Sequence, residues 1–495
     1  MTFNDSMYCS DLPTTPRSGS GKILVSGASG YIGGRLVPEL LERGYRLRVM
    51  VRTHSPEFKQ KWPEAEIVVA DAMDIDSLDD AFKGVHTAYF LIHSLLMGPE
   101  KLAQQEVIAA ENFRKKAEKH KLQRIIYLCG LGNIKSSLSS HLSSRMKVAE
   151  ILQKGSVPVT ILRAAIIIGS GSASYEIIMN LVKNMPFMLI PKWANTLCQP
   201  IGIRDVIKYL VGSLEKDETI GRQFDIGGKD VLSYISMIKT IATIMDKKCY
   251  LIPSPISNYK LYAYFAGLVT PVPAQITMCL FEGGKNEVVC QDNDILNIIK
   301  FEPLYFKESI SRAISVEKHG NICSKWSDAY PPSHSLATKL NELEKPARYR
   351  RSYSILTDKD ASSLFSSLCN IGGKRGWYAE NLMWRMRGYV DRILMGVRKS
   401  RGRMRNTVIG IDDVINFWRV ENLVKDKSML LRAEMVLPGQ AWLEFNIDPC
   451  VDINRLSVIA YFQPRNYKGH LYWYSFRPFH YFIFRKLLKQ IEIRS

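Results

Sequence analysis

Cysteine is scarce in this chain and shows no pairing motif. Nine cysteines are scattered over 495 residues, and no C-x-x-C occurs. A secreted disulfide scaffold concentrates an even number of cysteines at close spacing, so this odd and dispersed set favours a reducing compartment. His and Cys residues also do not gather at the spacing of metal ligands, and we therefore expect no metal site. These two absences predict a cytoplasmic protein.

Long apolar runs are also missing. A membrane span needs roughly 18 consecutive apolar residues, and the most apolar late segment, Tyr472–Phe484, is interrupted by Arg477, Pro478 and His480. Residues 1–20 are polar and rich in Ser, Thr and Pro, without the charged start and apolar core of a secretion signal. We therefore expect a disordered leader over residues 1–20 and no membrane span.

The chain does have enough apolar residues for several cores, and an excess of positive charge. Hydrophobic residues make up 46% of its 495 positions, which is too apolar for a disordered chain and too long for a single core. The formal charge is +19, and residues 341–495 hold 27 Lys and Arg against 15 Asp and Glu. We expect a first domain over residues 21–335, a polar linker over 336–347 and a Trp-rich second domain over 348–495.

A short apolar strand near the start of the chain runs directly into three regularly spaced glycines. Lys22–Ser26 is followed by Gly27, Gly30 and Gly33, and then by an apolar pattern of helical period. Missing side chains let the backbone approach a diphosphate, and the N-terminus of the next helix adds free N–H groups and the positive end of a dipole. A glycine triplet alone also fits a tight turn without a ligand, but the strand, turn and helix together predict a phosphate-binding turn.

Strands and helices alternate beyond this turn. Further strands are indicated at Tyr45–Val51, Ile67–Ala70, Val85–Ile92, Arg124–Leu128 and Val159–Gly169. Such alternation predicts an α/β fold, a doubly wound parallel Rossmann sheet with a small substrate subdomain behind it.

The last third of the chain has a different pattern. Three strands at Leu430–Val436, Ala441–Ile447 and Leu456–Phe462 are separated by turn signals, and an aromatic helix is indicated over Tyr472–Ile491. Sequential strands joined by short turns predict an antiparallel meander, and hence an α+β second domain.

Many ordered motifs of the first domain resemble one family. The matching segments are Ser26–Gly33, Val51-Arg52, Asp71-Ala72, Leu91–Ser94, Gly130–Gly132, Leu162–Ile166, Ile203–Val206 and Asp225–Gly228. Over residues 22 to about 318 they resemble an atypical short-chain dehydrogenase/reductase of the NAD(P)-dependent epimerase/dehydratase-like group. The resemblance implies a Rossmann fold and a bound NAD(P) cofactor.

The second domain carries its own resemblance. Gly376-Trp377, Phe417–Val420, Ala441–Phe445 and Tyr472–Tyr474 are similar to an uncharacterised domain often fused behind such reductases, which in turn resembles the helix-grip fold of polyketide cyclases and lipid-transfer proteins. That fold would wrap a sheet around the last helix and leave an apolar cavity for a lipid-like ligand.

The family resemblance implies a set of cofactor-binding residues. These are Gly27, Ser29, Gly30, Tyr31, Ile32, Gly33, Arg52, Asp71, Ala72 and Lys147. At the end of the second strand an acidic residue would accept hydrogen bonds from the ribose 2′-hydroxyl, whereas an arginine neutralises a 2′-phosphate. Arg52 therefore predicts NADP(H) over NAD(H), through a contact of roughly 1.5–3 kcal/mol, unless Arg52 is simply solvated. Asp71 is either a contact of the adenine amino group or a helix cap.

The usual catalytic pair of the resembled family is absent, because no tyrosine has a lysine four residues later. In Tyr-x-x-x-Lys one helical turn lets the ammonium lower the pKa of the phenol. Ser143 and Lys147 stand at the corresponding place, so Lys147 keeps a candidate ribose contact while serine is no phenolic acid. The substitute proton donors are His93 or Ser94 after the fourth strand and Tyr127 in the fifth. A quinone with its own proton route, or a domain that only binds the nucleotide, are the other accounts.

Two functions follow from these residues. The first is an NADP(H)-dependent oxidoreductase acting on a hydrophobic carbonyl, quinone or lipid-like substrate, with NAD(H) as a second cofactor. The alternative is a non-catalytic NAD(P)-binding redox sensor or scaffold with a lipid-binding second domain.

A basic stretch in the second domain bears on partners. Lys374–Arg405 carries ten Lys and Arg against Glu380 and Asp391, with apolar residues along one side. An anionic membrane surface and solvent around a packed helix both fit, while nucleic acid is disfavoured because no known binding module is present. A membrane contact would place the protein peripherally at the inner membrane face. The sequence says nothing about oligomeric state.

Overall fold

The computed structural model describes the chain as two compact units. The described residues are 7–17, 19, 21–52, 56–93, 99–132, 139–319, 324, 326, 338–343, 345–371, 409, 414–415, 418–434, 437–450 and 453–495. The first unit comprises Met1–Thr270 and Ala274–Pro331, and the second comprises Pro271–Pro273 and Pro332–Ser495. The basic stretch Lys374–Arg405 lies outside the described residues.

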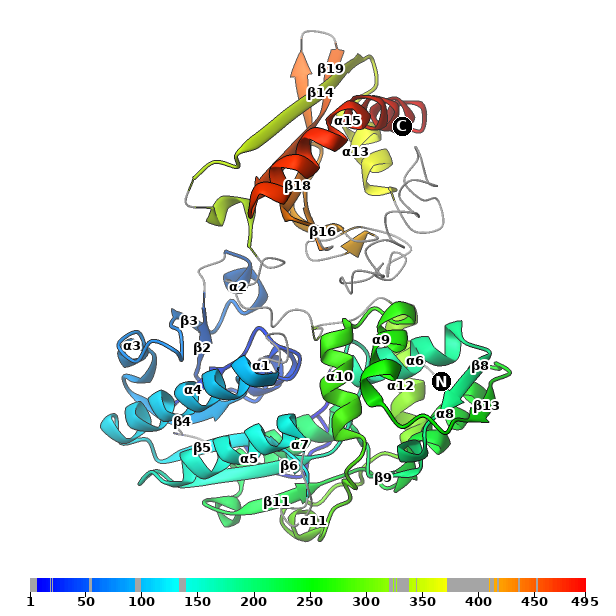
Figure 1. Ribbon diagram of the computed structural model, residues 1–495. Helices are drawn as coiled ribbons and strands as arrows, with labels where there is room; N and C mark the ends of the chain where they lie inside the picture. Colours follow the sequence, from blue (N-terminus) through cyan, green and yellow to red (C-terminus); the bar gives the residue numbers. More distant parts are fainter. Residues whose placement is uncertain are drawn as a thin grey trace. The chain divides into compact units, whose positions relative to one another are not determined.

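A seven-stranded parallel sheet forms the centre of the first unit (Figure 1). Its order is β11-β6-β5-β4-β1-β2-β3, and every neighbouring pair is parallel. The strands are β1 (Lys22–Ser26), β2 (Leu47–Val51), β3 (Glu66–Val69), β4 (Val85–Phe90), β5 (Arg124–Gly130), β6 (Val159–Ala164) and β11 (Gln223–Ile226). The predicted parallel α/β sheet is confirmed.

Helices cover both faces of this sheet, because alternate residues of a buried strand point to opposite sides. Ile23 and Val25 of β1 pack with α1 (Gly33–Glu42) and α7 (Ile203–Glu215) on one face. Leu24 packs on the other face, with α3 (Leu78–Phe82), α4 (Pro99–Lys119) and α5 (Ser140–Gln153). The sheet is therefore doubly wound, and its carboxyl edge is left to the loops.

A smaller subdomain follows β6 and has its own apolar cluster. Its elements are β7 (Ile167–Ile168), α6 (Ala173–Asn184), β8 (Phe187–Ile190), β9 (Leu197–Cys198), β10 (Ile201–Gly202), β12 (Leu232–Ser233), α8 (Tyr234–Ile244), β13 (Tyr250–Pro253), α9 (Tyr259–Val269), α10 (Ala274–Gly283), α11 (Asp294–Ile298) and α12 (Phe306–His319). Leu142 of α5 belongs to the same cluster, so the subdomain packs against the helix that follows β5.

The described part of the leader is packed, which corrects the prediction of disorder over residues 1–20. Cys9 and Leu12 are buried in the core cluster of α1 and α7. The backbone amides of Tyr8 and Cys9 donate hydrogen bonds to the Glu39 carboxylate, the latter at 3.1 Å. A polar composition predicted disorder, but two apolar side chains and one buried carboxylate on α1 are sufficient to hold this segment.

The second unit is built on a six-stranded antiparallel sheet of order β14-β19-β18-β17-β16-β15. The strands are β14 (Tyr349–Thr357), β15 (Val414–Ile415), β16 (Trp418–Val424), β17 (Ser428–Ala433), β18 (Gly439–Cys450) and β19 (Ile453–Pro464). Strands β16 to β19 pair in sequence order, so the predicted meander is confirmed. The helix α13 (Ala361–Cys369) and the long helix α15 (Tyr467–Ile493) lie across this sheet (Figure 1).

The long helix α15 has 27 residues and starts five residues earlier than predicted, at Tyr467. Its N-cap Asn466 accepts a hydrogen bond from the Lys468 amide at 3.1 Å, which fixes the start. Across the described helices, α15 included, length and apolar character never combine to the degree that a bilayer crossing requires.

Candidate functional site

The glycine turn after β1 has the backbone geometry that close approach to a ligand requires. Gly27 has a φ of +70°, and a Cβ added there would lie 2.6 Å from the Leu91 carbonyl oxygen. A Cβ on Gly33 would lie 2.4 Å from the Gly27 oxygen, so only glycine lets α1 pack this tightly on the turn. The Gly30 amide donates to the Gly27 oxygen at 3.0 Å and closes the turn.

The start of α1 suits an anion. Its N-cap residue Ile32 offers no side-chain hydrogen bond, and its first turn contains no acidic residue. The backbone amides of this end are therefore not capped by that side chain, and the positive end of the helix dipole is not neutralised there. These features fit a diphosphate and agree with the predicted roles of the residues from Gly27 to Gly33.

One residue that fixes this turn was not predicted. The Arg35 side chain is buried and donates to the carbonyl oxygens of Tyr31, at 3.2 Å, and of Ser170, at 2.7 Å. Its guanidinium also lies 4.3 Å from the centroid of the Tyr31 ring. Arg35 thus ties the phosphate turn to the loop after β7. An arginine inside an otherwise apolar helix face was the available signal.

Arg52 follows β2 as predicted and is half-buried. Burial lowers the pKa of its guanidinium, and the nearby Asp71 charge opposes that shift. The sequence showed no acid next to Arg52, whereas the structure brings Asp71 into its electrostatic range. The Asp71 carboxylate is exposed and accepts a hydrogen bond from the Met73 amide at 3.0 Å, so it stabilises a turn. Ala72 is buried beside it.

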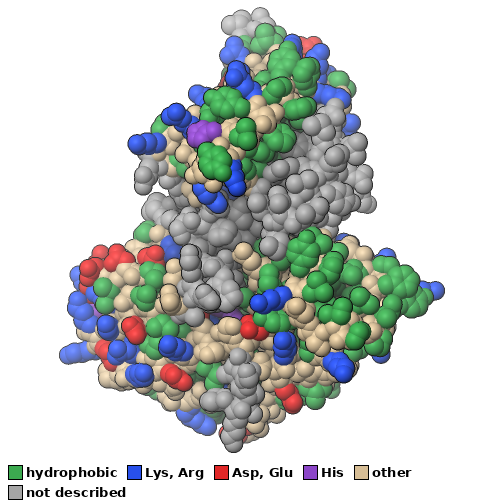
Figure 2. All heavy atoms as spheres, in the orientation of Figure 1, with side chains coloured by type: hydrophobic (Ala, Val, Ile, Leu, Met, Phe, Trp, Pro, Cys, Tyr) green, Lys and Arg blue, Asp and Glu red, His purple; other side chains and the backbone are tan. Residues whose placement is uncertain are grey.

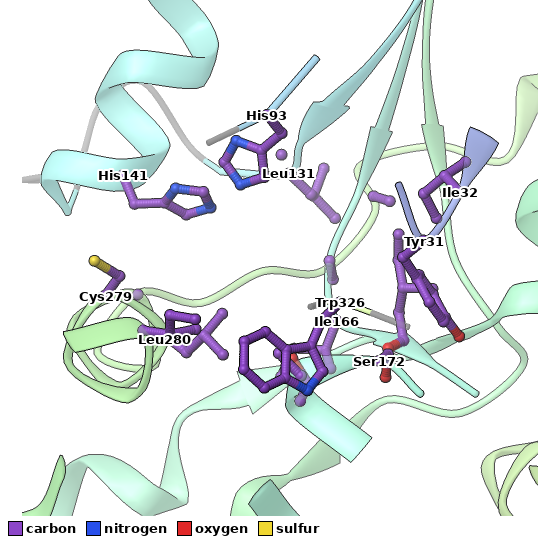
Figure 3. Close-up of a pocket in the computed structure, with 18 of the residues that line it drawn as sticks. Tyr31, Ile32, His93, Leu131, His141, Ile166, Ser172, Cys279, Leu280 and Trp326 are labelled. Atoms are coloured by element: carbon purple, nitrogen blue, oxygen red, sulfur yellow. The ribbon is translucent and has the colours of Figure 1, made fainter. Parts of the chain in front are cut away.

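A cavity of about 290 Å³ lies at the carboxyl edge of the sheet and is bounded by the phosphate turn. Figure 3 shows its walls, which are mostly apolar. They include Gly30 and Tyr31 from the turn, Leu131 after β5, Leu280 of α10 and Trp326. This volume is at the lower end of ordinary small-molecule pockets, where a few polar groups among apolar walls orient a ligand.

The helix α5 presents a different pair of residues to this region than predicted. Ser143 and Lys147 are exposed, and neither lines the cavity. Their neighbours His141 and Arg145, also four positions apart, lie on the inward face, and His141 lines the cavity. The one-turn spacing of His141 and Arg145 was the available signal in the sequence, but the Tyr-x-x-x-Lys motif directed attention to Ser143 and Lys147 instead.

His93 is the predicted donor that does line the cavity. Its Nδ1 lies 2.7 Å from Glu106 Oε1, and the Ser144 hydroxyl donates to Glu106 Oε2 at 2.6 Å. Burial and the Arg145 charge lower the pKa of His93. Burial opposes ionisation of Glu106, but the His93 and Arg145 charges and the Ser144 hydrogen bond hold its pKa well below the usual range. Glu106 is therefore a carboxylate at neutral pH.

Tyr127 lies in the core of the first unit rather than in the cavity. Its side chain is fully buried, and its hydroxyl donates to the Arg145 carbonyl oxygen at 3.1 Å. Burial raises its pKa far above 10, so this phenol holds α5 on β5. Ser94 lies outside the described residues.

Two family models match the chain. A family described as NAD(P)H-binding matches residues 27–183, and a family described as a protein of unknown function, DUF2867, matches residues 344–487. The first match begins at the phosphate turn and extends past the cavity-lining segments of α5 and β7.

Curated relatives match parts of the first unit. Cinnamoyl-CoA reductase 1 of Petunia hybrida is 29% identical over 126 residues, 24% of this chain and 38% of the relative. The photosystem II assembly factor Ycf39 of Trieres chinensis is 22% identical over 209 residues, 42% of this chain and 64% of that protein. The chain thus spans less than two thirds of the length of either relative.

Among solved structures, the Bordetella bronchiseptica enzyme WbmG in complex with NAD and UDP is similar. It is 15% identical, with a TM-score of 0.49 and coverage of 63% of this chain and 98% of WbmG.

Proposed function

We propose that this chain, whose N-terminal unit is an NAD(P)-binding Rossmann domain of the short-chain dehydrogenase and epimerase type, is an NADP(H)-dependent reductase of a hydrophobic carbonyl, quinone or lipid-like substrate. The observation that carries the proposal is the apolar cavity of about 290 Å³ whose wall includes the phosphate turn. A ligand in it would meet the cofactor at the carboxyl edge of the sheet, where open α/β sheets bind ligands.

The residues around the cavity divide the work of binding and positioning. Backbone amides from Gly27 to Gly33 would hold the cofactor diphosphate, and the bound cofactor would supply a hydride. Ile166, Leu280 and Trp326 offer the substrate an apolar surface and exclude water from it. His93 and His141 are the titratable imidazoles of the cavity wall, so any proton that the reaction needs has a donor within the same space.

The preference for NADP(H) depends on Arg52. A charge-assisted contact with the 2′-phosphate would contribute roughly 1.5–3 kcal/mol, about ten- to a hundredfold in affinity. We expect Arg52→Gln to weaken NADPH binding by that factor and to leave NADH binding within about twofold. The exposed Arg46 precedes β2, and Arg46→Gln is the matched control. Equal losses for both nucleotides, or no loss for either, would show that Arg52 is solvated.

Turnover is the direct test of the reductase proposal. Purified protein with NADPH is incubated with a panel of aromatic and aliphatic ketones, aldehydes, enones and quinones, and the absorbance of the reduced cofactor is followed. We expect oxidation of NADPH with an apolar member of the panel. Tight NADPH binding without turnover on any member would favour the alternative function, a non-catalytic sensor or scaffold, which the exposed Ser143 in place of a phenol supports.

For the second unit we propose a helix-grip-like holder of a hydrophobic ligand. A cavity of about 130 Å³ lies between the sheet and α15, lined by residues such as Trp442, Phe462 and Trp473. Its walls are aromatic and its volume is small, so a bound lipid chain would need these side chains to move. Solvent extraction of the purified protein followed by mass spectrometry should recover an apolar molecule, and an empty extract would contradict the proposal.

An anionic membrane surface is the partner that we propose for the second unit. On its visible face, hydrophobic side chains are mixed with Lys and Arg (Figure 2). On α15, Tyr467, Leu471 and Phe482 are 75%, 68% and 72% exposed, close in sequence to Arg477 and Arg485. Aromatic residues beside basic ones suit the lipid headgroup region. Sedimentation with vesicles of anionic lipid, and none with neutral vesicles, is the expected result.

A further inference from the structure

We propose that His141 gives a proton to the carbonyl oxygen of the substrate, the role that the phenol of Tyr-x-x-x-Lys fills in the resembled family. This inference rests on the proposed function, since it requires a reducible carbonyl in the cavity beside the phosphate turn. Its starting observation is the phase of α5. Of Ser143, Lys147, His141 and Arg145, only His141 lines the cavity.

The position of His141 favours a neutral imidazole. It is the second residue of α5, whose N-cap Ser139 accepts a hydrogen bond from the Leu142 amide at 3.3 Å. The positive end of a helix disfavours a second positive charge there. Burial, followed by the charges of His93 and Arg145, lowers the pKa of His141 to about 3. A neutral imidazole still carries one N–H, so it donates a hydrogen bond without bringing a charge into the cavity.

One nitrogen of this ring is not used by the rest of the fold. His141 Nδ1 is buried and has no hydrogen-bond partner within the described ranges. A buried polar atom of this kind is costly to leave unsatisfied. A carbonyl oxygen in the cavity would be a suitable acceptor for the imidazole N–H, and Figure 3 shows the ring on the cavity wall beside His93.

The neighbours of His141 supply the electrostatic support for proton transfer. The His93 and His141 ring centroids are 5.0 Å apart. His93 Nδ1 lies 2.7 Å from the buried Glu106 carboxylate, and Arg145 Nη1 lies 3.9 Å from the same oxygen. A carboxylate behind His93 stabilises positive charge that develops on the two imidazoles while a proton passes through them. Arg145 opposes a permanent imidazolium, which keeps the pair neutral between turnovers.

The step balances with one hydride and one proton. The bound reduced cofactor supplies a hydride to the carbonyl carbon, and the C=O π pair moves onto the oxygen. That oxygen takes the proton from the His141 N–H, and the product is an alcohol. The imidazole then recovers a proton from solvent through the side of the ring that faces His93. A neutral imidazole that polarises a carbonyl is an established chemical role for histidine.

Other donors on the cavity wall are less suited. Tyr234 of α8 and Cys279 of α10 both line the cavity. Burial raises the pKa of Tyr234 far above 10 and that of Cys279 to about 11. Neither belongs to the hydrogen-bonded group of His93, Glu106 and Ser144, so neither has that carboxylate to stabilise the developing charge. Tyr234→Phe is therefore included as the competing variant.

The activity test compares His141→Gln with two other variants on the ketone that wild type reduces. Glutamine keeps an N–H donor but transfers no proton. We expect turnover to fall by about 10²–10⁴-fold with NADPH affinity unchanged within about twofold, because a positioned proton donor contributes a factor of that size. His319→Gln, at an exposed histidine of α12, is the matched control and should behave as wild type. Tyr234→Phe should retain turnover within about fivefold, because only the loss of the proton donor itself produces the larger effect.

A second readout does not depend on turnover. Protein with ¹⁵N-labelled histidine is titrated with NADP⁺ and acetophenone, a pair that cannot react together. We expect the imidazole nitrogen resonances of His141, assigned by their loss in His141→Gln, to move when the ketone joins the complex.

The outcomes separate the two proposals. A wild-type protein that never oxidises NADPH overturns the reductase proposal, and the donor role of His141 with it. A wild-type protein that turns over while His141→Gln does so at the same rate overturns only the role of His141. The same conclusion follows if acetophenone binds and the His141 resonances do not move, or if Tyr234→Phe shows the large loss instead.

Discussion

Gly27 is the position at which one added methyl group tests the phosphate turn most directly. Its φ of +70° costs an alanine about 1–2 kcal/mol. The new Cβ would also lie 2.6 Å from the oxygen and 2.7 Å from the carbon of the Leu91 carbonyl. These are backbone atoms and cannot rotate away, so the turn itself must move, at an overpacking cost of about 1–3 kcal/mol.

Gly44 provides a matched control for Gly27→Ala. It ends α1 with a φ of +79°, and a Cβ added there meets no atom within 4 Å. Gly44→Ala therefore carries the conformational cost of about 1–2 kcal/mol without the clash. The difference between the two variants isolates the effect of displacing the phosphate turn, since both lose the same freedom of a left-handed glycine.

The assay for these variants combines stability with cofactor binding. Urea unfolding monitored on the transition that NADPH shifts should show a loss of about 2–5 kcal/mol for Gly27→Ala and about 1–2 kcal/mol for Gly44→Ala. NADPH titration should show at least a roughly tenfold weaker complex for Gly27→Ala, because losing one amide-to-phosphate bond costs about 1.5–3 kcal/mol. Gly44→Ala should bind as wild type does. A Gly27→Ala protein with wild-type affinity would refute the phosphate turn.

Three buried features give further expectations. Removing residues 1–17 should lower the thermal midpoint of the first unit, because it uncovers the core site of Leu12, and an unchanged midpoint would contradict this. Arg419 and Glu434 are 6% and 5% exposed as side chains, so Arg419→Met should cost the second unit about 3–5 kcal/mol and adding Glu434→Leu should recover most of it; equal urea midpoints would argue against a buried pair. Because burial lowers the His141 pKa to about 3, the unfolded chain binds a proton near pH 6.5 that the native state refuses, and stability falls by up to about 1.4 kcal/mol per unit as pH drops through that window; His141→Gln should lose less between pH 7 and 5, by urea unfolding.

The local features of the first unit were predictable because they are coded by neighbouring residues. A strand followed by Gly27 and Gly33 requires a turn that only glycine permits, and the structure shows the reason in the positive φ and the 2.4 Å approach. The alternation of strands and helices likewise predicted the parallel sheet. In the second unit, short turns between strands predicted the antiparallel meander from β16 to β19.

The catalytic face was not predictable in the same way. The apolar residues of α5 do not fall on one narrow stripe, so the sequence did not reveal which side faces the sheet. A family motif placed Ser143 and Lys147 inward, whereas packing on β5 and α4 turns His141 and Arg145 inward instead. Glu106, the carboxylate that organises this face, lies 38 residues from Ser144 in the chain.

The sequence by itself determined the elements whose cause is local: the glycine turn, the helix ends, the parallel and antiparallel strand patterns, and the arginine that ends β2. Only the tertiary structure decided which atoms meet. It packed Cys9 and Leu12 of the leader onto α1 and α7, and it set the rotation of α5 that brings His141 to the cavity beside His93. The physical reason is that a helix has one phase among several of similar local energy, and burial against distant strands chooses among them.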